Sequence, residues 1–202
     1  MFITFEGPEG AGKSSVANIL AHWLRGSGQE VATTREPGGS HFGPKVRSIL
    51  LEEDELSAEA ELFLFLADRA EHVSKLIRPW LEEGKVVLCD RFSDSTVVYQ
   101  GYGRGLDLQM LRELNRMACG GLEPDLTFLL DISPETSLKR LTAMDRMDRE
   151  PLEFHQKVRE GFLTEARRDP NRWVVVDASM PLDDVAELCK VKLEERRAPA
   201  AR

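Results

Sequence analysis

The chain has little cysteine and comparatively few basic residues, and each shortage argues against a class of protein. Only three cysteines occur in 202 residues, Cys89, Cys119 and Cys189, and they are far apart and lack metal-ligand spacing. Such thiols predict neither a disulfide framework nor a zinc site, and they suit a reducing cytoplasm. Lys and Arg number 27 against 35 Asp and Glu, for a net charge of −8. A protein whose main partner is a nucleic acid is usually basic, so we expect no such partner.

Long apolar runs are also missing. No stretch approaches the roughly 20 uninterrupted apolar residues that span a bilayer. The first six residues, MFITFE, lack the basic region and long apolar segment of a signal peptide. We therefore expect a cytoplasmic protein with no membrane partner. The segment 196–202 is biased toward Arg, Ala and Pro, and we predict that it is a disordered tail.

Short apolar runs are present, and they alternate with helical patterns. The predicted strands are 2–6, 30–34, 85–90, 126–131 and 173–177. Nearly continuous apolar strands separated by helices are typical of a parallel sheet with helices on both faces. The length suits a single core. We therefore predict one α/β domain over 1–195, with ligands beyond the carboxyl ends of the strands.

Local signals predict where helices begin. Ser133 and Pro134 are an N-cap and a first-turn proline, and they predict a helix that continues to Leu141. The longest helical pattern runs over 57–81, and Gly84 follows its end.

A phosphate-binding pattern directly follows the first predicted strand. The segment is Gly7-Pro8-Glu9-Gly10-Ala11-Gly12-Lys13-Ser14-Ser15, which satisfies Gly-x-x-x-x-Gly-Lys-Ser and leads into a helical pattern over 16–24. Glycines let successive backbone N–H groups point at phosphate oxygens, and the helix adds the positive end of its dipole. The pattern predicts that Lys13 reaches the β- and γ-phosphates of ATP and that Ser14 binds Mg²⁺.

The alternative is a glycine-rich turn that binds nothing. The strand before it, the helix after it and the complete motif argue against that alternative. The motif does not identify the nucleotide or the group that accepts the phosphate.

Asp90 and Arg91 stand at the end of the third predicted strand. An acidic residue beside the phosphate loop can hold Mg²⁺ through water, and an adjacent guanidinium can clamp a phosphate. The alternative is a surface ion pair, which contributes little. Glu36 and Arg47 follow the second strand, where Glu36 could meet a sugar hydroxyl or a metal-bound water and Arg47 an acceptor phosphate. Arg47 could equally be a solvated helix charge.

Phe65 and Arg69 are four residues apart on the long helix and so share a face. A ring stacked on a base, beside a guanidinium that donates to a carbonyl, would recognise a pyrimidine such as thymine. Periodicity alone favours core packing of Phe65.

The segment 145–151, Asp-Arg-Met-Asp-Arg-Glu-Pro, lies between a helix predicted to end near Met144 and one predicted to start near Leu152. It predicts a short mobile lid whose arginine closes over the transferring phosphoryl group. A solvated charged loop is the alternative.

These segments together resemble the thymidylate kinase family over 1–193. The similarity rests on the motifs FEGPEGAGKS, TREPGG, DRF, YQG and PDLT at 5–14, 34–39, 90–92, 99–101 and 124–127. The resemblance implies a P-loop kinase fold with a five-stranded parallel sheet and a homodimer. It also implies Mg²⁺-dependent phosphorylation of dTMP to dTDP by ATP, for dTTP synthesis.

The resemblance also implies roles for individual residues. Phe65 would stack on thymine, Arg69 would meet a base carbonyl, and Thr96 and Gln100 would address the remaining base edge. Ser95 would also belong to the substrate-binding set. Tyr99 would lie against the deoxyribose, Glu9 near the acceptor sugar, and Arg47 and Arg91 on the monophosphate. The implied catalytic set is Lys13, Arg91, Arg146 and Glu9, and the implied metal site is Ser14 with Asp90.

One position distinguishes branches of that family. Gly10 stands where one branch has an arginine inside the phosphate loop, and the lid here carries Arg146 and Arg149. This is the bacterial-type arrangement, with Arg149 on the ATP side. Phe92 stands where a tyrosine is often found.

Other functions make different demands on the sequence. A uridylate or guanylate kinase would share the phosphate loop and lid, but not the set Phe65, Arg69 and Gln100. A GTP-dependent switch would need Asn-Lys-x-Asp to recognise guanine, and the chain has no such segment. An ATPase that acts on nucleic acid would be expected to have a basic face.

Overall fold

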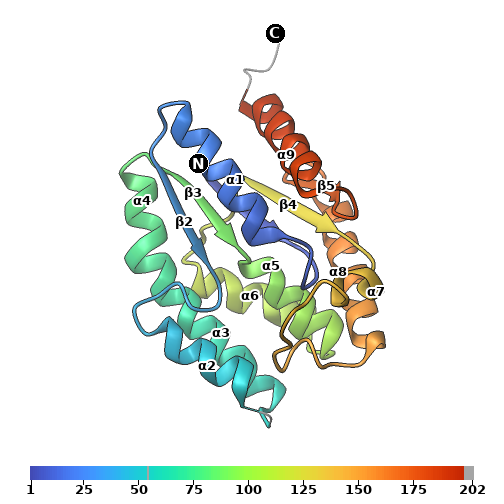
Figure 1. Cartoon of the computed structure of the whole chain (residues 1–202). Coiled ribbons are helices and arrows are strands. Elements are labelled where there is room, and N and C mark those ends of the chain that lie inside the picture. Colours follow the sequence, from blue (N-terminus) through green and yellow to red (C-terminus); the bar gives the residue numbers. More distant parts are fainter. Residues whose placement is uncertain (54, 198–202) are drawn as a thin grey trace.

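The protein is described by a computed structural model covering residues 1–53 and 55–197. Five strands form one sheet: β1 (Phe2–Glu6), β2 (Val31–Arg35), β3 (Val86–Asp90), β4 (Leu126–Asp131) and β5 (Trp173–Asp177). Their order is β2-β3-β1-β4-β5, and every neighbouring pair is parallel (Figure 1). The predicted α/β fold with a five-stranded parallel sheet is confirmed.

Helices connect the strands in the described part of the chain (Figure 1). They are α1 (Lys13–Gly26), α2 (Gly43–Glu52), α3 (Ala58–His72), the π-helix η1 (Val73–Ile77), α4 (Arg78–Glu82), α5 (Ser93–Thr96), the π-helix η2 (Val97–Gly103), α6 (Leu108–Ala118), α7 (Pro134–Leu138), α8 (Leu152–Arg168) and α9 (Leu182–Arg197). Over 1–53 and 55–197, none of them combines the length and apolarity needed to cross a membrane.

The long helical pattern predicted over 57–81 is present, but it is not uniform. α3, η1 and α4 follow one another without a break and end at Glu82. Pro79 lacks the N–H that would bond four residues back in an α-helix, and the wider π turns precede it. The ends of β2 and β3 lie within one residue of the predicted strands.

Two predicted boundaries were wrong. The helix opened by the Ser133 N-cap ends at Leu138 and reaches neither Leu141 nor Met144. Beyond it the backbone makes tighter turns, with Arg140 N–H bonded to the Ser137 carbonyl, while the Arg140 side chain donates to Ala178 O. The tail was predicted to begin at 196, but 196 and 197 belong to α9; 198–202 lie outside the described residues.

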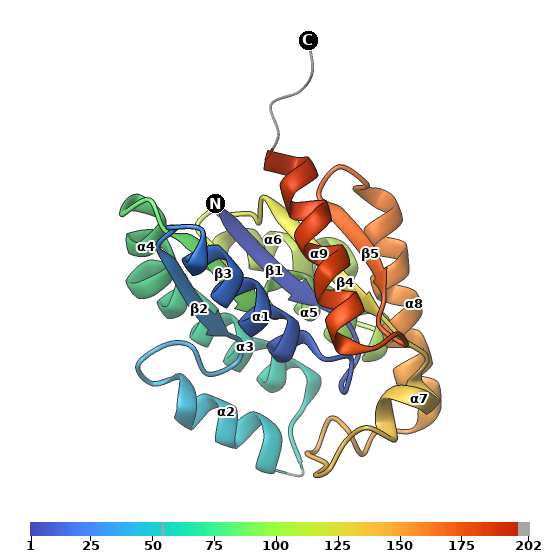
Figure 2. The same ribbon diagram turned by 45° about the horizontal axis from the view of Figure 1, so that its top comes forward.

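Helices cover both faces of the sheet, as predicted (Figure 2). On one face, α1 and α9 pack on side chains such as Ile3 and Phe5. On the other face, Phe2 packs with η1, and Leu129 packs with α8. Because successive strand residues point to opposite faces, each central strand must be apolar at nearly every position.

The sheet order brings three strand ends together. Asp90 at the end of β3 is level with Phe5 in β1 and with Arg35 in β2. The segments that follow these strands are the phosphate loop, the loop from Glu36 and the turn at Arg91. They therefore meet at one edge, where parallel sheets bind ligands.

Candidate active site

The phosphate loop has a backbone that its glycines make possible. Gly7, Gly10 and Gly12 have φ angles of 137°, 71° and 89°. A Cβ on Gly7 would lie 2.5 Å from the Leu130 carbonyl oxygen, so no larger residue fits there without a shift. The loop ends at the N-terminus of α1, where unpaired N–H groups and the helix dipole favour an anion.

Lys13 lies across the loop. Its Nζ donates to the carbonyl oxygens of Pro8 at 2.7 Å and Gly7 at 3.1 Å, and it is 3.9 Å from the Glu9 carboxylate. Burial lowers the pKa of Lys13, and the positive charge of Arg91 adds to this effect. A largely desolvated cation beside loop N–H groups is suited to binding phosphate.

The two residues predicted to hold Mg²⁺ are in direct contact. Ser14 Oγ at the start of α1 donates to Asp90 Oδ2 at the end of β3. Their oxygens are ligands of the kind Mg²⁺ prefers. No group of three or more His, Cys, Asp or Glu residues with metal-site geometry occurs within 1–53 and 55–197. Two protein oxygens fit a Mg²⁺ ion that is otherwise held by phosphates and water.

Arg91 has an unusual backbone and several side-chain contacts. Its φ is 67°, a left-handed conformation uncommon for a residue with a Cβ. Its guanidinium donates to Glu9 at 2.5 Å, to the Tyr99 hydroxyl at 3.0 Å and to Ser95 Oγ at 3.1 Å. Although burial acts in the other direction, Arg91 and Lys13 lower the pKa of Glu9 to about 2. Glu9 and Arg91 therefore form a charged pair at neutral pH.

Glu6 holds the turn that carries Arg91. Its Oε1 accepts from the Phe92 backbone N–H at 2.8 Å, and its Oε2 accepts from Ser95 Oγ at 2.5 Å. Glu6 is fully buried, and burial together with the nearby charge of Asp94 raises its pKa to about 7. From the sequence, Glu6 was expected only as the last residue of a strand and as part of the motif at 5–14, with no role of its own.

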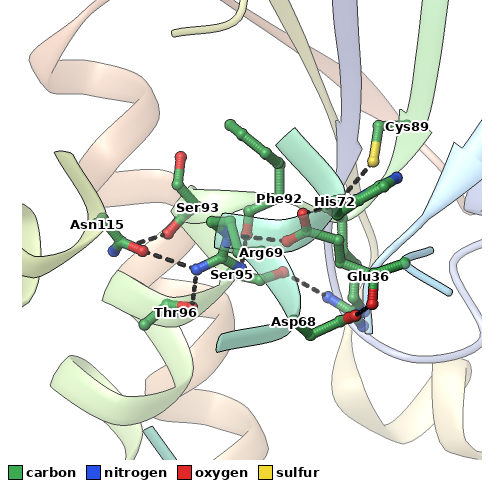
Figure 3. A network of polar contacts seen from close by, with 12 residues as sticks. Glu36, Asp68, Arg69, His72, Cys89, Phe92, Ser93, Ser95, Thr96 and Asn115 are labelled. Atoms are coloured by element: carbon green, nitrogen blue, oxygen red, sulfur yellow. Dashed lines mark hydrogen bonds and ion pairs between the residues drawn. The ribbon is translucent and has the colours of Figure 1, made fainter. Parts of the chain in front are cut away.

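Arg69 is the centre of a buried polar network (Figure 3). Its Nε donates to Glu36, its Nη1 to Thr96 Oγ1 and Asn115 Oδ1, and its Nη2 to the Phe92 carbonyl, at 2.7–3.1 Å. These contacts use four of the five guanidinium N–H groups. Arg69 thus joins α3 to the segments after β2 and β3.

Glu36 is anchored at both carboxylate oxygens. Oε2 pairs with Arg69, and Oε1 lies 2.9 Å from Nδ1 of buried His72. Burial would raise the pKa of Glu36, but Arg69 and His72 outweigh it and lower the pKa. In place of a sugar hydroxyl or metal-bound water, Glu36 contacts protein groups in this structure.

Most of the predicted site residues line one cleft. They are Glu9, Gly12, Lys13, Ser14, Ser15, Glu36, Arg47, Phe65, Arg69, Asp90, Arg91, Ser95, Thr96, Tyr99 and Gln100. Phe65 is only partly buried and faces this cleft, so core packing, the reading favoured by periodicity, does not describe it. Arg47 also lines the cleft, and it donates to the Pro37 carbonyl at 3.1 Å.

The lid arginines lie elsewhere. Arg146 donates to Glu61 at 2.5 Å and to the Leu50 carbonyl at 3.0 Å, and it is not among the cleft-lining residues. Arg149 is exposed and donates to the Met144 carbonyl at 3.3 Å. The lid residues that line the cleft in this conformation are Asp145 and Met147.

Glu61 on α3 links the lid to the cleft. It accepts from Arg146, from Arg104 at 3.4 Å and from Gln100 Nε2 at 2.8 Å. Burial would raise the pKa of Glu61, but hydrogen bonds from Arg146 and Gln100 and the charge of Arg104 lower it. Glu61 is therefore an ionised carboxylate behind the cleft.

Sequence reasoning missed Glu61, His72 and Asn115. Glu61 precedes Phe65 by four residues and Arg69 by eight, so helical spacing places all three on one face. That spacing was the available signal. Asn115 had none, because its partners Arg69 and the Ser93 carbonyl are distant in the sequence.

Known proteins of one family match this chain over most of its length. A family model described as thymidylate kinase matches residues 5–189. The thymidylate kinase of Desulfovibrio desulfuricans is 50% identical over 206 residues, covering 96% of this chain and 95% of that protein. That of Nitratidesulfovibrio vulgaris is 55% identical over 197 residues, covering 92% and 88%.

A solved structure shares the fold. The crystal structure of thymidylate kinase from Ehrlichia chaffeensis superposes with a TM-score of 0.79 at 36% identity, covering 96% of this chain and 98% of that one. The family match and the high coverage of these relatives lead to one assignment: the chain belongs to the thymidylate kinase family.

Proposed function

We propose that this protein transfers the γ-phosphoryl group of ATP to dTMP and forms dTDP, a step in dTTP biosynthesis. The supporting observation is the cleft itself. Lys13 of the phosphate loop lines the same cleft as Phe65 and Arg69 of α3. Membership of the thymidylate kinase family supports dTMP as the acceptor.

The donor side is the phosphate loop, residues 7–15. Its N–H groups and Lys13 would bind the β- and γ-phosphates, and Ser14 with Asp90 would hold Mg²⁺. The bound ion would neutralise phosphate charge as the transfer proceeds. Arg149, which lies in the lid, would contact ATP.

The acceptor side is built around Phe65. Its ring would stack on thymine, with Arg69, Thr96 and Gln100 at the base edges and Ser95 near the acceptor. Tyr99 would lie against the deoxyribose, with Glu9 near the sugar. Glu36 also lines the cleft, and its carboxylate holds the guanidinium of Arg69 in place.

Arg47 and Arg91 would hold the acceptor phosphate between them. Arg91 is well suited to this role because Glu9, Ser95 and Tyr99 fix the orientation of its guanidinium. Orienting the phosphate before transfer lowers the entropic part of the barrier.

The lid, residues 145–151, would change position during the reaction. Arg146 would leave Glu61 and the Leu50 carbonyl and turn toward the transferring group, where its positive charge stabilises the transition state.

A substrate panel tests the assignment. ADP release is measured from ATP and Mg²⁺ with dTMP, dUMP, UMP, dCMP, AMP or GMP as acceptor, for the wild type and Lys13→Met. We expect clear preference for dTMP and a loss of about 10²-fold or more in kcat for Lys13→Met. Preference for UMP or GMP would instead identify a different monophosphate kinase. Turnover without any acceptor would indicate an NTPase.

We further propose that the protein is a cytoplasmic homodimer. Large apolar side chains are exposed on three neighbouring helices: Ile49 on α2 (39%), Phe63 on α3 (61%), and Met110 (40%) and Met117 (73%) on α6. Exposed large apolar side chains on adjacent helices are often found where a protein interface forms. The free, buried thiols of Cys89, Cys119 and Cys189 support a reducing compartment. Sedimentation should give the dimer mass for the wild type and a monomer for Met117→Glu; a wild-type monomer would contradict the proposal.

A further inference from the structure

The contact between Gln100 and Glu61 determines how the Gln100 amide is oriented. Gln100 Nε2 lies 2.8 Å from Glu61 Oε1, and both side chains are 1% exposed. An ionised carboxylate can only accept hydrogen bonds, so it must face the amide NH₂ and not the amide oxygen. Arg104 and, while the lid is in this position, Arg146 each place a positive charge on Glu61 and favour its ionised form; Arg104 remains when Arg146 turns away. The orientation of the Gln100 amide therefore follows from the chemistry of its partner.

Fixing the NH₂ group on Glu61 leaves Oε1 of Gln100 for the cleft. Gln100 lines the cleft beside Thr96 and Phe65. Within residues 1–53 and 55–197, Gln100 donates through Nε2, and no protein group donates to its Oε1. Oε1 is also not one of the fully enclosed polar atoms without a partner, which is consistent with its opening onto the cleft. The cleft therefore presents a hydrogen-bond acceptor at this position.

Pyrimidine bases differ at the atom that would meet this acceptor. Position 3 of thymine or uracil is an N–H donor, whereas position 3 of cytosine is a lone-pair acceptor. Placing that lone pair against Oε1 would leave two buried acceptors facing each other, which is costly. A site built to bind a hydrogen-bond donor discriminates strongly against an analogue that lacks it.

We infer that Glu61 is a specificity-determining positioning residue, which holds the Gln100 amide so that the acceptor site selects pyrimidines with an N3–H over cytosine. The inference rests on the proposed placement of the base beside Gln100. Glu61 acts through Gln100 and does not touch the substrate. Without its negative charge the amide is free to turn over and offer NH₂ to cytosine N3.

A double-mutant cycle tests this role. The measured quantity is kcat/KM for dUMP divided by kcat/KM for dCMP, in the wild type, Glu61→Gln, Gln100→Met and the double variant. Effects of releasing Arg104 or Arg146 are common to both acceptors and largely cancel in this ratio. Arg69 contributes to the ratio, because position 4 is a carbonyl in uracil and an amino group in cytosine, but this contribution is the same in all four proteins and cancels when they are compared. Glu187→Gln, an exposed change on α9, is the matched control and should leave the ratio unchanged.

We expect Glu61→Gln to lower the ratio about tenfold, and to have no further effect once Gln100 is methionine. If Glu61→Gln does not fold, Glu61→Asp keeps the charge but withdraws it by one methylene, and it should lower the ratio too. An unchanged ratio in the Glu61 variants, with a lowered ratio in Gln100→Met, would overturn the inference alone. An unchanged ratio in Gln100→Met would overturn the proposed base placement as well.

Discussion

Arg69 Nε lies 2.8 Å from Glu36 Oε2, and neither side chain is more than 4% exposed. The pair connects α3 to the first residue after β2, and the same guanidinium binds Thr96, Asn115 and the Phe92 carbonyl. A residue chosen from the sequence as a base-binding group is therefore also part of the framework of the cleft.

Replacing Arg69 should damage stability as well as binding. Arg69→Ala leaves the buried Glu36 carboxylate without its guanidinium partner and with only His72 beside it, so we expect a loss of about 3–5 kcal/mol in the free energy of unfolding. The KM for dTMP should rise as well. Urea titration followed by steady-state kinetics measures both effects, with the exposed Arg167→Ala as a control that stays within about 0.5 kcal/mol. Unchanged stability would contradict the structural role.

The two lid arginines should differ in their effect on turnover. If Arg146 stabilises the transferring phosphoryl group, Arg146→Ala should lower kcat by about 10³- to 10⁵-fold, with a smaller effect on the KM for dTMP. Arg149 is exposed and should matter less. Parallel kinetics of Arg146→Ala and Arg149→Ala decide between them. Equal, small losses would show that the lid acts only as a solvated loop.

Phe65 should contribute to acceptor binding through its ring. It lines the cleft and is only partly buried, so Phe65→Ala removes a stacking surface more than a core contact. Stacking on a base is worth about 1–3 kcal/mol, which predicts a KM for dTMP raised roughly tenfold. The KM for ATP, measured in the same experiment, serves as the internal control. Equal increases for both nucleotides would point to a general structural defect.

Glu6 should make stability depend on pH near neutrality. Its pKa is about 7 in the folded protein and 4.5 for the free side chain, so the folded state binds its proton more tightly. This contribution is complete below pH ~4.5 and is lost as the pH rises through about 7, an effect on the order of 3 kcal/mol. Glu6→Gln stays neutral and lacks this loss. Calorimetry between pH 5 and 8 should show the Tm of Glu6→Gln rising relative to wild type as pH increases; parallel curves would refute the assignment.

The sequence by itself determined the elements and the phosphate loop. Strand and helix alternation is local, and so is the spacing of Gly7, Gly12, Lys13 and Ser14, because backbone curvature and the following helix are encoded within a few residues. The strand predictions were within one residue for the same reason. The position of Asp90 at a strand end was enough to predict its meeting with Ser14.

Only the tertiary structure decided which charged side chains are partners. Arg146 and Glu61 are 85 residues apart, and Arg69 and Asn115 are 46 apart. No periodic pattern links such pairs, because they meet only when α3, η2, α6 and the lid pack together. The early end of α7 has the same origin, since Arg140 binds carbonyl groups near β5. Local spacing thus selected the chemical groups, and long-range packing determined their orientation and their neighbours.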